Sequence, residues 1–166
     1  MNLDNLNELP EWDDDDFKDE DIEGEDWRTN PTSELCRAMY EQWNTVLLVL
    51  KAAFDSMKEP GEDSIFINKE FLEDQKEMIL GDAYEVAAKI RSSEVGLYVI
   101  RMENAAIIRK NAQFIKVSTN NFIDDDLMEP EHRRIVRQEI DIFRDLFKKW
   151  VASFERDEYE DEWGLF

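Results

Sequence analysis

The feature that most constrains the fold is an apolar seam between residues 31 and 59. Along it, apolar side chains recur at alternating steps of four and three residues, which places them on one face of an α-helix. The seam consists of Cys36, Tyr40, Trp43, Leu47, Leu50, Phe54 and Met57. Asn30-Pro31 before it is a typical helix start, and Pro60-Gly61 after it is a typical stop. The pattern predicts a helix over 31–59 that buries one face.

A second seam of the same kind lies near the end of the chain. Its members are Val136, Ile140, Phe143, Phe147, Trp150 and Phe154. Glu129-Pro130-Glu131 precedes it, with proline in the first turn and acids near the positive end of the helix dipole. This predicts a helix over 129–157.

The segment 68–119 is harder to divide, because its two apolar stripes are in phase. They are Leu72, Ile79, Ala83, Val86 and Ile90, followed by Leu97, Ile100, Ile107 and Phe114. One helix of about 50 residues, roughly 75 Å long, is one alternative. A break at Gly81-Asp82, where Asp82 and Glu85 imitate a capping box, is another. We favour a reversal within 92–96, because helices over 68–92 and 96–119 match the lengths of the other two. The resulting fold is an all-α, up-down-up-down four-helix bundle.

The charge of the chain is concentrated at its two ends. The whole sequence has 41 acids and 20 bases, a net charge of −21. Residues 1–30 hold 13 acids and two bases, and residues 155–166 hold six acids and one base, which leaves −5 for the 124 residues between them. Like charges resist compaction. We therefore expect an extended or loosely packed acidic tail over 1–30, a helical domain over 31–157 and an acidic aromatic tail over 158–166.

The composition also restricts partners and location. A chain this acidic repels phosphates, so we expect no direct binding to nucleic acid or to anionic membranes. A single cysteine, Cys36, forms no internal disulfide, and the N-terminal residues lack the basic and apolar regions of a secretory signal. The run VLLVL (46–50) is too short to span a bilayer. We expect a cytoplasmic protein.

Polar side chains interrupt the third predicted helix at positions expected to face the interior. If Ile100, Ile107 and Phe114 face the core, Asn104 and Asn111 stand on the same seam. Arg101 and Glu103 flank them and could pair with Glu41, Asn44 or Asp82 of neighbouring helices. The four residues Arg101, Glu103, Asn104 and Asn111 form a polar layer that fixes how the helices pair, a small ligand pocket or, if the helix is phased differently, a stripe that faces solvent.

The inventory of reactive residues argues against an enzyme. There is one histidine, His132, and one cysteine, Cys36, on different predicted helices. A Cys/His zinc site or a di-iron carboxylate bundle needs more of them. His132 with Arg133 and Arg134 could suit phosphotransfer, but it stands at a helix start. We expect no catalytic, cofactor or metal residues.

The tails carry large apolar side chains that inert acidic tails rarely have. Candidates for docking onto a partner are Trp12, Phe17, Tyr159, Trp163, Leu165 and Phe166. The C-terminal EYEDEWGLF resembles the acidic tail ending in phenylalanine of bacterial single-strand DNA-binding proteins, without the usual proline before the last residue. That resemblance implies recruitment of a partner protein. Self-packing of these side chains is the alternative, which we favour for Trp27.

These observations predict a non-enzymatic bundle that binds another protein. Its acidic aromatic tails would dock on a basic and apolar groove of the partner. One alternative is an acidic inhibitor that mimics nucleic acid and blocks a basic protein. Another is a small-ligand or metal-binding bundle that uses the polar residues of the third helix. Self-association into a homodimer is left open.

Overall fold

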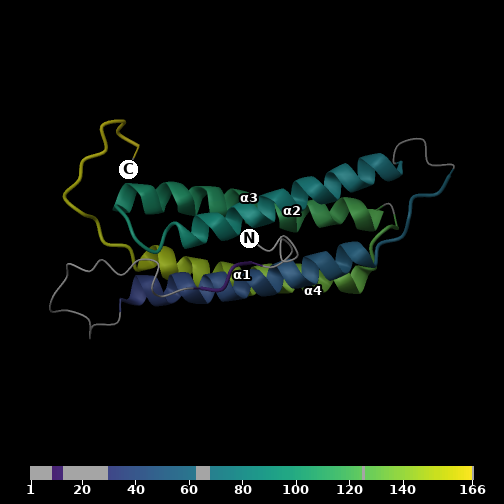
Figure 1. Ribbon diagram of the computed structural model, residues 1–166, viewed down its shortest axis with the longest axis horizontal. Coiled ribbons are helices and arrows are strands. Elements are labelled where there is room, and N and C mark those ends of the chain that lie inside the picture. The colour runs from purple at the N-terminus through teal and green to yellow at the C-terminus, as the bar shows by residue number, and fades with distance from the viewer. Residues whose placement is uncertain (1–8, 13–29, 63–67, 125, 166) are drawn as a thin grey trace.

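Four α-helices make up the fold, as the sequence predicts. The computed structural model describes residues 9–12, 30–62, 68–124 and 126–165, with only the backbone at 123 and 124. The helices are α1 (Pro31–Asp55), α2 (Lys69–Arg91), α3 (Tyr98–Asp124) and α4 (Pro130–Ala152) (Figure 1). The described residues contain no strand. The all-α fold is confirmed, and residues 68–119 form two helices and not one.

The helices alternate in direction along the chain and form two layers (Figure 1). Helices α1 and α4 pack side by side in one layer, and α2 and α3 pack side by side in the other. The layers meet where α1 contacts α2 and α3 contacts α4. This is the up-down-up-down arrangement, in which each helix is antiparallel to the next.

Side-chain hydrogen bonds account for where the helices begin. The Asn30 side chain accepts a hydrogen bond from the backbone N–H of Thr32 at 3.0 Å. The Asn68 side chain accepts one from the backbone N–H of Phe71 at 2.8 Å. Both asparagines therefore satisfy N–H groups that lack a partner in the first turn.

The helix ends differ from the prediction by several residues. Helix α1 ends at Asp55, where the hydroxyl of Ser56 donates to the carbonyl of Ala52 at 2.8 Å. Helix α4 ends at Ala152, where the hydroxyl of Ser153 donates to the carbonyl of Trp150 at 2.6 Å. A serine hydroxyl offers the last carbonyls an alternative to the next helical N–H, so both helices stop before 59 and 157. Helix α3 continues past 119 to Asp124.

The chain reverses between α2 and α3, as the sequence favours. Helix α2 runs without interruption through Gly81 and ends at Arg91, so the alternative break at Gly81-Asp82 is wrong. Gly96 has a φ of +132°, a backbone conformation that side chains other than glycine rarely adopt. Glycine at position 96 therefore lets the chain turn back without backbone strain.

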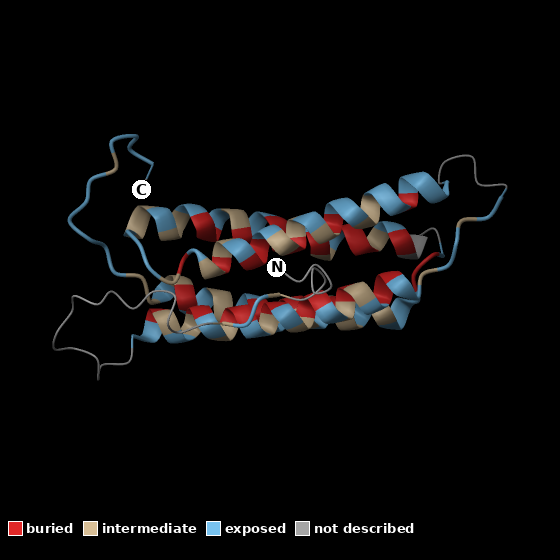
Figure 2. Cartoon of the chain, in the orientation of Figure 1, coloured by how far each residue is buried: buried red, intermediate tan, exposed pale blue. Residues whose placement is uncertain are grey.

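Aromatic side chains of α1 and α4 fill the centre of the core, which forms a continuous buried strip along the helices (Figure 2). The rings of Trp43 and Phe143 lie 4.7 Å apart, and those of Trp150 and Phe154 lie 4.6 Å apart. The indole N–H of Trp43 also donates to the carbonyl of Ala83 in α2 at 2.7 Å. Trp43 thus links α1 with α4 and with the other layer.

The buried face of α3 differs from the expected one. Ile100 and Phe114 are 43% and 39% exposed, Leu97 is exposed, and Ile107 is half-buried. The expectation that these residues line the core is wrong. The buried positions are Asn104, Ala105, Ile108, Asn111, Ala112, Ile115, Ser118, Thr119 and Phe122. The core face is turned by about one residue, because small side chains such as Ala105 and Ala112 let α3 pack closely.

The role of Trp43 can be tested against an exposed residue of the same helix. Trp43→Ala removes a fully buried ring and one hydrogen bond, so it should lower the free energy of unfolding by about 3–5 kcal/mol. Leu48→Ala, at a position 57% exposed, should change it by less than about 0.5 kcal/mol. Urea denaturation followed by circular dichroism measures both. Equal losses in the two variants would contradict the core assigned here.

Candidate functional site

Two buried asparagines lie between α2 and α3. The side-chain N–H₂ of Asn104 donates to the hydroxyl of Ser93 at 2.9 Å, and that hydroxyl donates to the carbonyl of Lys89 at 2.6 Å. The side-chain N–H₂ of Asn111, which is 2% exposed, donates to a carboxylate oxygen of Glu85 at 2.7 Å. Both amides are directed at α2 and its end. The two asparagines join α2 and α3 at two positions along the length of the helices.

Arg101 extends this polar contact to the end of α2. Its guanidinium donates to the carbonyls of Ser93 at 3.2 Å and Glu94 at 2.9 Å. Both carbonyls lie in the turn that follows α2, so these bonds hold the turn against the first part of α3. These backbone bonds replace the pairing with Glu41, Asn44 or Asp82 considered from the sequence.

Glu103 lies apart from the other three polar residues of the predicted group. It is exposed, while Arg101, Asn104 and Asn111 bond to the α2 side of the hairpin. The three that converge have partners within the protein. Their geometry supports a layer that aligns α2 with α3 more than it supports an open ligand pocket.

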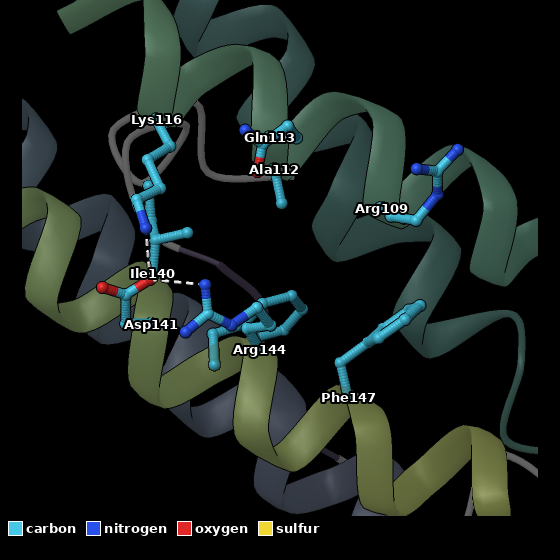
Figure 3. Close-up of a pocket in the computed structure, with 9 residues that line it drawn as sticks. Arg109, Ala112, Gln113, Lys116, Ile140, Asp141, Arg144 and Phe147 are labelled. Atoms are coloured by element: carbon cyan, nitrogen blue, oxygen red, sulfur yellow. Dashed lines mark hydrogen bonds and ion pairs between the residues drawn. The ribbon is translucent and has the colours of Figure 1, made fainter.

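A shallow groove between α3 and α4 is the site that sequence reasoning missed (Figure 3). Ala112, Ile140, Phe143 and Phe147 supply its apolar lining, and Arg109, Gln113, Lys116, Asp141 and Arg144 supply polar groups. The cavity measures about 60 Å³. Typical small-molecule sites measure about 300–1,000 Å³, so this groove is too small to enclose such a ligand.

Two ion pairs centred on one carboxylate lie at the rim of this groove. Asp141 of α4 pairs with Lys116 of α3 and, at 3.1 Å, with Arg144 of its own helix (Figure 3). In the sequence these residues belong to ordinary charged helix faces. Only the pairing of α3 with α4 brings Lys116 to Asp141, so no local pattern could have identified the site.

The N-terminal segment 9–12 packs against the bundle. The ring of Trp12 lies 5.3 Å from that of Tyr40 at a steep angle, and the guanidinium of Arg91 lies 5.5 Å from the Trp12 ring. The Tyr40 hydroxyl donates to the carbonyl of Pro10 at 2.7 Å. Trp12, a candidate for docking onto a partner, therefore contacts the protein's own helices. The candidate Phe17 and the residue Trp27 lie outside the described residues.

The C-terminal tail contacts the bundle at its start and leaves it afterwards. A carboxylate oxygen of Asp157 accepts the backbone N–H of Tyr98 at 2.8 Å, which caps the first turn of α3. The guanidinium of Arg156 lies 5.4 Å from the Tyr98 ring. Beyond this anchor, Tyr159 is exposed, and the tail extends from the bundle beside the start of α3 (Figure 1).

A turn organised by Asp161 presents the last apolar side chains of the tail. The Asp161 carboxylate accepts the backbone N–H groups of Trp163 at 3.1 Å and Leu165 at 2.7 Å. Trp163 is nevertheless 93% exposed and Leu165 is 64% exposed. The candidate Phe166 lies outside the described residues. This short turn thus displays two large apolar side chains to solvent.

Two residues with reactive side chains lie on α1 and α4. Cys36 is fully buried, and its thiol donates to the carbonyl of Ile90 at 3.0 Å. Burial raises the pKa of the Cys36 thiol to about 12, with a smaller contribution from Glu94, while Arg101 acts in the opposite direction. The Nδ1 atom of His132 lies 3.1 Å from the hydroxyl of Ser56. A protonated, enclosed thiol is a poor nucleophile.

Comparison with protein-family models, with curated proteins and with solved structures finds no match to this chain. Within the described ranges, no helix combines the length and the apolar composition needed to cross a bilayer. In the same residues, no three His, Cys, Asp or Glu side chains come together in a group that could hold a metal ion.

Substitution of Asn111 tests the polar layer. Asn111→Leu should leave the free energy of unfolding within about 0.5 kcal/mol of the parent, because the exposed Glu85 regains water when the amide is lost. Asn111→Asp should cost about 2 kcal/mol or more, because it buries a second carboxylate beside Glu85. Thermal and urea denaturation provide the comparison. A large loss in the leucine variant would show that the amide itself is needed for stability.

The raised pKa of Cys36 predicts a loss of stability in alkali. Its ordinary pKa is 9.0, so above that pH the unfolded chain releases a proton that the folded chain keeps until about pH 12. The contribution of this thiol to the free energy of unfolding is therefore fully present below pH 9. Above pH 9 it falls by about 1.4 kcal/mol per pH unit. Between pH 8 and 10.5, the free energy of unfolding should fall by about 2 kcal/mol less in Cys36→Ala than in the parent. Urea denaturation at both pH values measures this difference. Parallel pH profiles of the two proteins would contradict the assignment.

Proposed function

We propose that this protein is a non-enzymatic bundle that binds another protein through its C-terminal tail. The observation that carries the proposal is the exposure of Trp163 on a turn that is itself held by hydrogen bonds. A ring of this size buries about 200 Å² when covered, which is about 5 kcal/mol of apolar transfer before the entropic costs of association are subtracted. Such a side chain kept in solvent is well suited to enter an apolar pocket of a partner.

The charges of the tail define the chemistry of that partner. Six acids and one base lie within residues 155–166. Their field speeds encounter with a basic surface, while Trp163 and Leu165 supply the apolar contact area. The partner surface would therefore be an apolar groove with a basic rim. The Asp157 anchor on α3 fixes where the tail leaves the bundle, which limits the entropy lost on binding.

The lone, buried Cys36 supports a reducing location for this activity, and we place the protein in the cytoplasm. The polar layer of α3 gives less support to a ligand-binding function, because Arg101, Asn104 and Asn111 already bond to neighbouring groups. The α3–α4 groove gives less support as well, because it is small and its Asp141 is paired with two cations.

A capture experiment with matched variants tests this function. Immobilised full-length protein should retain a specific protein from a cell extract, and the double variant Trp163→Ala/Leu165→Ala should lose it. Leu48→Ala, which removes an exposed apolar side chain elsewhere, is the control and should retain it. With the purified partner, the tail variant should raise the dissociation constant by about a hundredfold or more.

The salt dependence separates this function from mimicry of nucleic acid. Contact dominated by Trp163 should largely survive 0.5 M salt, because screening acts on the exposed charges and not on apolar burial. Binding that is lost in 0.5 M salt but unchanged in the tail variant would overturn the proposal in favour of an acidic inhibitor. An unchanged set of bound proteins for all variants would also contradict it.

A further inference from the structure

An apolar stripe runs along the solvent side of α3. Ile100, Ile107 and Phe114 recur at intervals of seven residues, which keeps them on one side of the helix. Ile100 and Phe114 are exposed and Ile107 is half-buried. Seven of the twelve exposed large hydrophobic residues in the described chain belong to the α2–α3 hairpin; they are Phe71, Met78, Val95, Leu97, Ile100, Phe114 and Val117. The apolar surface of this bundle is thus concentrated on one hairpin.

The stripe has the same spacing in both directions from Ile107. Ile100 and Phe114 each lie seven residues from it, which keeps both on the same side of the helix. In a two-fold interface the same patch is used by both copies, so such a patch must match itself. Two α3 helices crossing antiparallel at Ile107 would set Ile100 against Phe114 at both ends of the contact.

Charged residues of opposite sign lie at nearly equal distances on either side of Ile107. Glu103 lies four residues before Ile107, and Lys110 lies three residues after it. Both are exposed, and within one chain they stand about 10 Å apart along the helix axis, two turns away from each other. Across the antiparallel crossing, Glu103 of each copy would face Lys110 of the other. The arrangement therefore gives two equivalent ion pairs.

The electrostatics of the hairpin also favour this face for contact between copies. Two molecules of net charge −21 repel each other. Helices α2 and α3 together hold eight bases and eight acids, and Glu94 in the turn between them leaves the hairpin with a net charge of only −1. The acids in excess lie elsewhere, mainly within 1–30 and 155–166. The hairpin is therefore a face where two copies can approach with little local repulsion.

We infer that the exposed face of α3 binds a second copy of this chain, antiparallel and centred on Ile107. This inference uses a different surface from the C-terminal tail and does not depend on the proposed function.

Sedimentation equilibrium tests the inference. The parent protein should form a dimer in the micromolar range. Ile107→Glu should weaken it at least a hundredfold, because two carboxylates would meet at the two-fold axis. Leu48→Glu adds the same charge at an exposed apolar position of α1 and should leave the dimer unchanged. Circular dichroism would confirm that both variants remain helical.

Charge reversal tests the direction of the crossing without changing the apolar contact. Glu103→Lys and Lys110→Glu, each alone, should weaken the dimer by about tenfold, because each places like charges across the interface twice. The combined variant Glu103→Lys/Lys110→Glu should restore it. A parent that stays monomeric at 1 mM, or a dimer that survives Ile107→Glu, would overturn the inference. A combined variant as weak as the single ones would overturn the antiparallel crossing.

Trp163→Ala separates this inference from the proposed function. The substitution should leave the dimer intact, since Trp163 lies on the tail and not on the stripe. A dimer lost in Trp163→Ala would show that the tail and not α3 joins the copies, and would overturn the inference.

Discussion

The contact of Trp43 with both helix layers is the interaction on which the rest of the bundle depends. Its ring packs on Phe143 of α4, and its N–H donates to the carbonyl of Ala83 in α2. This bond offsets the cost of removing the indole N–H from water, because the Trp43 ring is fully buried. This one side chain therefore contributes apolar area within its own layer and a directional bond to the other.

Polar contacts hold helix α3 against both of its neighbours. Asn104 and Asn111 tie it to the α2 side of the hairpin, and Arg101 donates to the carbonyls of Ser93 and Glu94 in the turn after α2. On its other side, the guanidinium of Arg137 in α4 donates to the carbonyl of Lys116 at 2.9 Å. Polar groups specify one alignment, because a shifted helix would leave them unpaired. This alignment leaves Ile100 and Phe114 on the surface.

The sequence predicts the parts of this fold that rest on long periodic patterns. The seams that include Trp43 in α1 and Phe143 in α4 are unambiguous, and the reversal near Gly96 follows from matching helix lengths. The phase of α3 is ambiguous, because Ile107 and Ile108 are adjacent and either could face the core. Local patterns also give no information on long-range contacts. Self-packing of Trp12 is one of the alternatives that the sequence offers, but the sequence identifies neither Tyr40 as its neighbour nor the Lys116–Asp141 pair.

The distance between residues 78 and 117 tests the central claim, that the chain reverses between α2 and α3, most directly. Nitroxide labels at Met78→Cys and Val117→Cys, both exposed positions, can be measured by electron paramagnetic resonance in a Cys36→Ala background. The account predicts a separation below about 20 Å, because residues 78 and 117 lie at similar heights on antiparallel helices, as the Glu85–Asn111 bond indicates. A separation near 58 Å, the length of 39 residues in one continuous helix, would contradict it.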